Sequence, residues 1–185
     1  MRRDEIGIGR GVLSKVWRWG IGQQCDRRYL RPLNNPNSTM PITRIATATW
    51  KGTGKEGAGS VSTTSGVLNN APHSHHTRFV SEDGKAGTNP EELIAAAHAS
   101  CFTMKMSFVL NAAGFTADQL DCTVQVKMDK VGDGNGVVGI HLELKGKVPG
   151  IGAEQFQTCA ENAKENCPIS QLLKSVPITL SATLA

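Results

Sequence analysis

The stretch from Leu93 to Leu110 constrains the fold of this chain more than any other feature. It is apolar on nearly every side of a helix, and Lys105 is its only charged residue. A helix that is apolar all round is normally buried inside a protein. Five polar residues interrupt the stretch and argue against a membrane-spanning segment. They are His98, Ser100, Thr103, Lys105 and Ser107. We therefore expect a central core helix, in a chain of 185 residues that has room for one domain and an appendage.

This helix has clear start and stop signals. Asn89 is a good N-cap, and Pro90 suits the first helical position. Glu91 and Glu92 place carboxylates at the positive end of the helix dipole. Gly114 can adopt the left-handed conformation that ends many helices. The helix is therefore predicted to begin at Pro90 and to stop before Gly114.

Two of the five cysteines occupy marked positions. Cys101 lies in the middle of the core helix, and Cys167 directly precedes Pro168, which predicts an N-cap followed by proline at the first helical position. The ordinary interpretation of each is a small buried side chain. A thiol at a helix N-terminus, however, faces free amides that favour the thiolate. Cys101 is far from either helix end, so it would need a nearby cation.

The other thiols are Cys25, which lies in the N-terminal extension, and Cys122 and Cys159, which are interpreted as core residues. The cysteines form no CxxC pair and no metal-ligand spacing, so we expect no metal site and no cofactor. No secretory signal is recognisable. These features favour a reducing compartment, and we expect a cytoplasmic protein whose thiols are functional.

The charge of the chain is unevenly distributed, although the net value is +4. Residues 1–39 carry eight basic and three acidic side chains, which leaves twelve basic and thirteen acidic ones for residues 40–185. The near-neutral body gives no electrostatic support for nucleic-acid binding. Residues 1–39 lack a regular pattern and are interpreted as an extension, either a transit peptide or a segment upstream of a start at Met40. Residues 40–185 are the predicted domain.

The remaining pattern predicts strands and a few helices. Strands are expected over 42–50, 120–131, 137–148 and the closing ITLSATL segment, and PHSHHTRF is expected to end in a short strand. Residues 153–166 have a helical stripe of apolar residues, namely Phe156, Cys159, Ala160 and Ala163. Strands and hairpins with segregated helices predict an α+β fold.

The chain resembles the osmotically inducible protein C (OsmC) family, the sister group of the organic hydroperoxide resistance (Ohr) proteins. The resemblance covers roughly residues 42–184 and rests on five stretches: STTSGVLNN, TRF, GTNPEELIAAAHASCF, AGFT and KENCPISQLLK. It implies antiparallel sheets around a central buried helix, an intertwined homodimer, and thiol-dependent reduction of organic hydroperoxides, and to a lesser extent of hydrogen peroxide, in oxidative or osmotic stress defence. A dithiol such as a lipoyl-bearing protein is the implied reductant.

The resemblance also implies roles for four residues. Cys101 would be the peroxidatic thiol, Cys167 the resolving thiol, Arg78 the activating cation and Glu91 its carboxylate partner. A guanidinium held by a bidentate carboxylate suits both a thiolate and the alkoxide that leaves. Glu91 and Cys101 are separated by about 15 Å along a continuous helix, so we expect Arg78 and Glu91 to serve Cys101 of a second subunit.

The shape of the substrate site is less well determined by these motifs. The HSHH segment before Arg78 departs from the family pattern, which leaves the substrate entrance open. Apolar side chains of the core helix could face the alkyl part of a peroxide, although core packing is the ordinary interpretation of each: Leu93, Phe102, Met104, Met106 and Phe108.

Two alternative functions rest on histidines. His98 lies three residues before Cys101 on the same helix face, and a Cys–His pair would indicate a hydrolase or thioesterase. His73, His75 and His76 could bind a metal and would indicate a binding module. Core packing for His98 and solvation for the other three are the ordinary interpretations.

Overall fold

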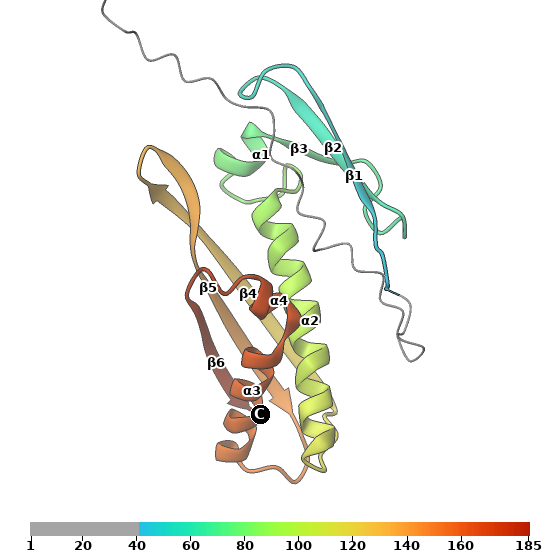
Figure 1. The fold of residues 1–185 in the computed structure, drawn as a ribbon, viewed down its shortest axis with the longest axis vertical. Coiled ribbons are helices and arrows are strands. Elements are labelled where there is room, and N and C mark those ends of the chain that lie inside the picture. Colours follow the sequence, from blue (N-terminus) through green and yellow to red (C-terminus); the bar gives the residue numbers. More distant parts are fainter. Residues whose placement is uncertain (1–40) are drawn as a thin grey trace, which may run out of the picture. The chain divides into compact units, whose positions relative to one another are not determined.

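The computed structural model describes residues 41–185, in which Arg44–Ala185 form one compact unit. Two three-stranded sheets and four helices make up this unit (Figure 1). In chain order they are β1 (Ala46–Lys51), β2 (Ala58–Thr63), β3 (Ala71–Ser74), α1 (His75–Phe79), α2 (Pro90–Ala112), β4 (Gln119–Val131), β5 (Gly134–Lys147), α3 (Ala153–Asn166), α4 (Pro168–Leu172) and β6 (Ile178–Leu184). The mixed α+β class is confirmed. The extension over residues 1–39 lies outside the described residues and stays a prediction.

The ends of α2 are those predicted from local signals. The Asn89 side chain accepts a hydrogen bond of 2.8 Å from the Glu92 amide, and Pro90 occupies the first turn. At the other end Gly114 has a φ of 86°. The amides of Gly114 and Phe115 donate to the carbonyls of Asn111 and Leu110 at 3.0 and 2.9 Å. This pattern satisfies carbonyl groups that the helix itself leaves free.

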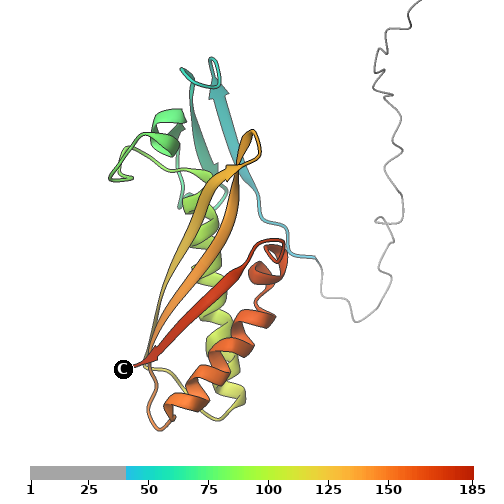
Figure 2. The same cartoon turned by 90° about the vertical axis from the view of Figure 1, so that its left-hand side faces the viewer.

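The main core lies between the β4–β5–β6 sheet and two helices on one of its faces (Figure 2). Helix α2 packs against β4, and α3 packs against β6 and α2. The predicted inner stripe of α3 is confirmed, since all four of its residues are buried. A side chain at Gly146 of β5 would overlap the Phe156 ring, so glycine allows α3 to approach the sheet closely. The largest fully buried apolar side chains are Phe102, Phe156, Met106, Leu110, Leu142 and Leu144.

Two predictions about the strands are wrong. The sheets are not all antiparallel, because β6 pairs parallel to β5 after a crossover through α3 and α4. The HHTRF segment is helix α1 rather than a strand. Ser74 caps this helix: its side chain accepts from the Thr77 amide at 3.1 Å, and its own amide donates to the Thr77 hydroxyl at 2.8 Å. This capping box decides the local structure over the β-forming residues.

Helix α2 is buried along one face only. His98, Phe102, Met106 and Leu110 are buried, whereas Met104 and Phe108 are 60% and 64% exposed. The predicted burial of the whole helix therefore does not hold within a single chain. By length and composition alone α2 also qualifies as a membrane-spanning helix, contrary to the prediction from its polar residues. Its buried face nevertheless packs in the core of this unit.

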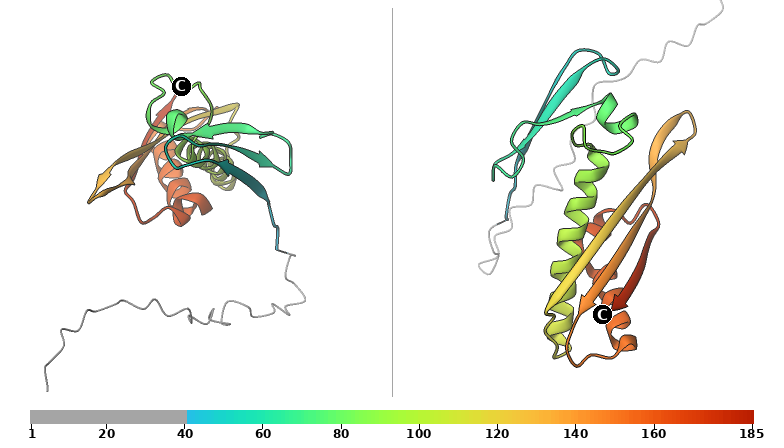
Figure 3. Two further views of the ribbon diagram at one scale, coloured as in Figure 1. Left: turned by 90° about the horizontal axis from the view of Figure 1, so that it is seen from above. Right: turned by 180° about the vertical axis from the view of Figure 1, so that it is seen from behind.

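The second sheet, β1–β2–β3, lies beside the N-terminal end of α2 (Figure 3). All six residues of β1 are exposed. The Thr88 amide donates to the Pro72 carbonyl at 2.9 Å, and the Thr77 hydroxyl donates to the Thr88 carbonyl at 3.0 Å. These bonds fix α1 against the segment that leads into α2, and so place Arg78 next to the first turn of α2.

Candidate active site

The first half of the candidate site is a pair of thiols. Cys101 lies in the middle of α2, and Cys167 is the N-cap residue of α4. Both are free, Cys101 partly exposed and Cys167 fully buried. The two side chains are within hydrogen-bonding reach of each other. The fold therefore brings together two cysteines that are far apart in the sequence.

The start of α4 contacts Cys101 rather than Cys167. The Ile169 amide donates a hydrogen bond to the Cys101 sulfur, whereas the Cys167 side chain makes no capping hydrogen bond. Cys101 is far from both ends of its own helix, as expected, and the amide that reaches its sulfur comes from a different helix. Burial raises the pKa of the Cys101 thiol, and the Cys167 thiol raises it further, while the Ile169 hydrogen bond acts in the opposite direction. The net effect is a raised Cys101 pKa.

The second half of the candidate site is an ion pair between α1 and α2. The Arg78 guanidinium donates from Nε to Glu91 Oε2 at 3.0 Å and from Nη2 to Glu91 Oε1 at 2.6 Å. Arg78 Nη2 also lies 3.8 Å from the Met128 sulfur, and the guanidinium carbon, Cζ, lies 5.0 Å from the centre of the Phe79 ring. The bidentate geometry fixes the plane of the guanidinium. One edge stays accessible, because the Arg78 side chain is 36% exposed.

These two halves do not meet within one chain. Glu91 and Cys101 are both on α2, ten positions apart, which corresponds to about 15 Å along a helix. Arg78 is held by Glu91 at the start of the helix. A single chain thus has a thiol pair without the guanidinium and a guanidinium without the thiol.

A cleft of about 250 Å³ adjoins Arg78. Aromatic pairs line it: the Trp50 and His73 rings are 5.2 Å apart, and the His75 and Phe79 rings are 4.9 Å apart. Two histidines of the HSHH segment thus form part of its wall. The apolar residues predicted for a substrate wall do not line this cleft. Phe102 and Met106 pack in the core, whereas Met104 and Phe108 are exposed.

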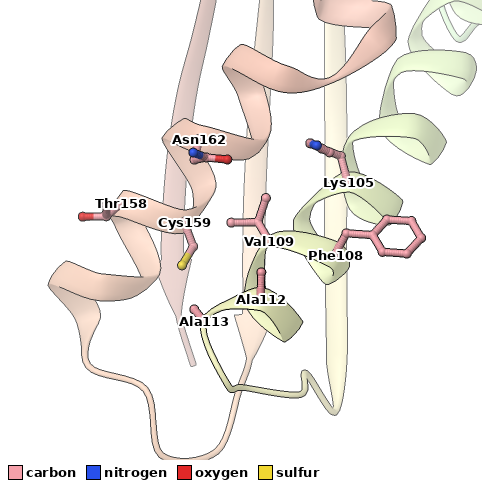
Figure 4. Close-up of a pocket in the computed structure, with 8 residues that line it drawn as sticks. All are labelled: Lys105, Phe108, Val109, Ala112, Ala113, Thr158, Cys159 and Asn162. Carbon is pink, nitrogen blue, oxygen red and sulfur yellow. The ribbon is translucent and has the colours of Figure 1, made fainter.

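A larger cleft of about 450 Å³ lies between the C-terminal half of α2 and α3. It is lined by Lys105, Phe108, Val109, Ala112, Ala113, Thr158, Cys159 and Asn162 (Figure 4). Neither Cys101 nor Cys167 is among its lining residues. This cleft is therefore separate from the thiol pair.

Comparison with known proteins identifies the family. Residues 82–181 match the family described as OsmC-like protein. The chain is 48% identical over 145 residues to Peroxiredoxin OsmC of Escherichia coli, an alignment that covers 78% of this chain and 99% of that protein. The chain belongs to the OsmC-like protein family.

Other relatives of this OsmC-like protein agree. An organic hydroperoxide resistance protein of Xanthomonas axonopodis pv. citri is 34% identical over 102 residues, covering 53% of this chain and 68% of that protein. The crystal structure of an organic hydroperoxide resistance protein OsmC from Legionella pneumophila has a TM-score of 0.59 at 27% identity and covers 77% of this chain and 97% of that one. The crystal structure of the organic hydroperoxide resistance protein OhrB from Bacillus subtilis has a TM-score of 0.58 at 25% identity, and it covers 75% of this chain and 98% of that one.

The structure does not support a Cys–His pair in this OsmC-like protein. His98 Nε2 lies 2.8 Å from the Ser170 hydroxyl, and its Nδ1 has no hydrogen-bond partner within the described residues. Burial lowers the pKa of His98, so the ring is neutral near pH 7. The described contacts of His98 are with Ser170 and not with Cys101, and its lowered pKa makes the ring a weak base.

The metal-binding alternative is not supported either. Residues 41–185 contain no group of three histidine, cysteine or carboxylate side chains that could hold a metal ion. His73 lies in β3, and His75 and His76 lie in α1.

Three contacts in the OsmC-like protein were not predicted from the sequence: the Ile169 amide, the Ser170 hydroxyl and the Met128 sulfur. Each depends on packing between elements distant in the chain. One signal was available, because His98 shares its helix face with Phe102 and Met106, which indicates a buried ring that needs a polar partner.

Proposed function

We propose that this OsmC-like protein is a thiol-dependent peroxidase that reduces organic hydroperoxides, with Cys101 as the attacking thiol and Cys167 as the resolving thiol. The observation that carries the proposal is the contact between Cys101, Cys167 and the Ile169 amide. The relatives support the reaction class, because one that is 48% identical is named a peroxiredoxin and others are named organic hydroperoxide resistance proteins.

The proposed reaction has two steps and balances in electrons. The Cys101 thiolate attacks the outer oxygen of the hydroperoxide, an S–O bond forms and the O–O bond breaks, and the alkoxide takes up the proton that the thiol had released and leaves as the alcohol. Cys101 is then a sulfenic acid, oxidised by two electrons. The Cys167 thiol attacks its sulfur, a disulfide forms, and water leaves. A dithiol reductant returns both cysteines to thiols by exchange.

The raised Cys101 pKa means that the first step needs a cation. Arg78 can stabilise both the thiolate and the oxygen that leaves, and Glu91 orients it. Because Arg78 is held at the start of α2, we propose that it reaches Cys101 of a second copy.

A homodimer also accounts for the exposed apolar surface of one chain. Met104 and Phe108 project from the unburied face of α2, and Trp50 on β1 is 41% exposed. Exposed side chains of this size that share a helix face are typical of an interface. A partner copy would cover them and complete the site.

Peroxide consumption by the single-cysteine variants tests the proposal. Cys101→Ser is expected to consume no tert-butyl or cumene hydroperoxide, because a serine hydroxyl is not ionised at neutral pH. Cys167→Ser is expected to consume about one equivalent and then stall as a sulfenic acid. Cys159→Ser is the matched control and should turn over normally with a dithiol.

Two results would contradict the proposal. One is full turnover by Cys101→Ser. The other is peptide mapping of the peroxide-treated protein that finds Cys167 free or joined to another cysteine. Faster consumption of hydrogen peroxide than of the organic substrates would contradict the substrate class alone.

A further inference from the structure

A buried polar pair joins the two helices that carry the thiols. His98 Nε2 of α2 and the Ser170 hydroxyl of α4 are 2.8 Å apart, and the two residues are 0% and 5% exposed. His98 lies about one turn before Cys101, and Ser170 lies three residues after Cys167. The pair therefore connects the surroundings of both thiols through a single hydrogen bond.

This pair is an unusual element for a hydrophobic core. Its neighbours along α2 are Phe102 and Met106, and the second ring nitrogen of His98 has no partner among the described residues. Burying an unsatisfied polar atom costs stability, and two apolar side chains would avoid that cost. A role in stability alone therefore gives a poor account of this hydrogen bond.

Helix α4 needs an external attachment to keep its position. It has five residues, too few for a helix to be stable by itself. Its backbone bonds from Gln171 to Cys167 and from Leu173 to Ile169 are internal to the segment. In the described part of the chain, its other side-chain bond runs from Gln171 to the Glu165 carbonyl on α3. Apart from the contact between the thiols, the described side chains join α4 to α2 directly through the hydrogen bond between Ser170 and His98.

We propose that His98 and Ser170 are positioning residues, a clasp that holds α4 so that the Ile169 amide and the Cys167 thiol stay against Cys101. This inference rests on the proposed peroxidase function. The clasp acts on both steps. It keeps the Ile169 hydrogen bond on the sulfur during attack on the peroxide, and it keeps Cys167 within reach of the sulfenic acid afterwards.

Ser170→Ala tests the clasp with the loss of one oxygen atom. In rapid mixing of the full chain with tert-butyl hydroperoxide, we expect the pH midpoint of the first step to rise. Disulfide formation should slow by about tenfold, the factor that corresponds to one buried hydrogen bond. Sulfinic acid at Cys101, measured by mass spectrometry, should increase because the sulfenic acid lives longer.

Four further variants separate positioning from general stability. Ser170→Thr keeps the hydroxyl and should recover most of the rate. His98→Phe fills similar space without a ring nitrogen and should match Ser170→Ala, and the double variant should be no slower than either single one. Thr158→Ala removes an exposed hydroxyl that bonds only within α3 and should behave like the unmodified protein.

The outcomes distinguish the clasp from the proposed function. If the unmodified protein forms no disulfide between Cys101 and Cys167, the proposed function is wrong. If it does, and Ser170→Ala and His98→Phe form it at the unmodified rate with the same pH midpoint, the clasp is wrong and the function stands. A lowered melting temperature with unchanged rates would equally overturn the clasp. If Ser170→Ala does not fold, the rates of His98→Phe and Ser170→Thr decide.

Discussion

At the scale of single residues, the proposed reaction depends on how Cys101 becomes a thiolate. Within one chain its pKa is raised, chiefly by burial and then by Cys167, and the Ile169 amide offsets this only in part. The guanidinium of Arg78, whose plane is fixed by two hydrogen bonds to Glu91, is the group suited to lower the Cys101 pKa again.

Changing Arg78 to Ala should raise the Cys101 pKa further and slow the reaction with organic hydroperoxide by on the order of a hundredfold. Arg78→Lys should recover only part of the rate, because an ammonium keeps the charge but cannot hold both Glu91 oxygens in one plane. The pH dependence of thiol alkylation and the first-step rate measure both effects. An unchanged thiol pKa in both variants would exclude Arg78 from the site.

Cys122 illustrates a thiol that the fold keeps unreactive. Burial, followed by the proximity of Cys167 and Glu143, raises its pKa to about 11. At pH 8 only about one molecule in a thousand would carry its thiolate.

We therefore expect Cys122 to be alkylated far more slowly at pH 8 than a cysteine in the unfolded chain, as measured by peptide mass spectrometry over time. Cys122→Val should leave peroxide turnover unchanged. Labelling of Cys122 at the rate seen in the urea-unfolded protein would contradict this prediction.

At the scale of elements, His98, which joins α2 to α4, should make the free energy of unfolding depend on pH. Burial lowers the pKa of His98 in the folded state, whereas an unfolded histidine titrates near 6.5. As the pH falls below about 6.5, the unfolded state takes up a proton that the folded state does not, so the free energy of unfolding decreases. Above about pH 6.5 both states hold His98 neutral, and this loss of stability is absent.

Urea unfolding between pH 7.5 and 5.0 should show this loss, with a slope of at most about 1.4 kcal/mol per pH unit from this one group. His98→Phe should reduce the slope, while the other histidines remain in both proteins and cancel in the comparison. Equal slopes in the two proteins would show that His98 is not held neutral.

At the scale of the whole molecule, Arg78 is bound to Glu91 at the start of α2, ten positions before Cys101, and this separation predicts sites shared between two copies. A chain with Arg78→Ala supplies an intact thiol pair, and a chain with Cys101→Ser supplies an intact guanidinium. A mixed dimer of the two then has one complete site and one that lacks both groups.

Each variant alone should be nearly inactive, whereas co-expression in equal amounts should restore about a quarter of the unmodified activity, since half of the dimers are mixed and each has one site. Co-expression of Arg78→Ala with Glu91→Gln, whose defects affect the same half-site, is the control and should stay well below that value. No recovery in the first mixture, under conditions where mass spectrometry detects mixed dimers, would show that each site lies within one chain.

The sequence by itself determined the features that depend on neighbours within a few residues. Asn89 and Pro90 start α2, Gly114 ends it, and the apolar stripe of α3 faces the core as predicted. The Cys167–Pro168 pair starts α4. Caps, proline geometry and helical periodicity act over one or two turns, so they can be recognised without knowing the fold.

The tertiary structure decided what depends on segments far apart in the chain. It set the parallel pairing of β6, the bidentate contact of Arg78 with Glu91, and the bond between His98 and Ser170, which are 72 positions apart. It also showed that the Ile169 amide of another helix reaches Cys101. Such contacts form because the chain must satisfy buried polar groups and close its core at once, a condition on the whole fold that no short stretch of sequence contains.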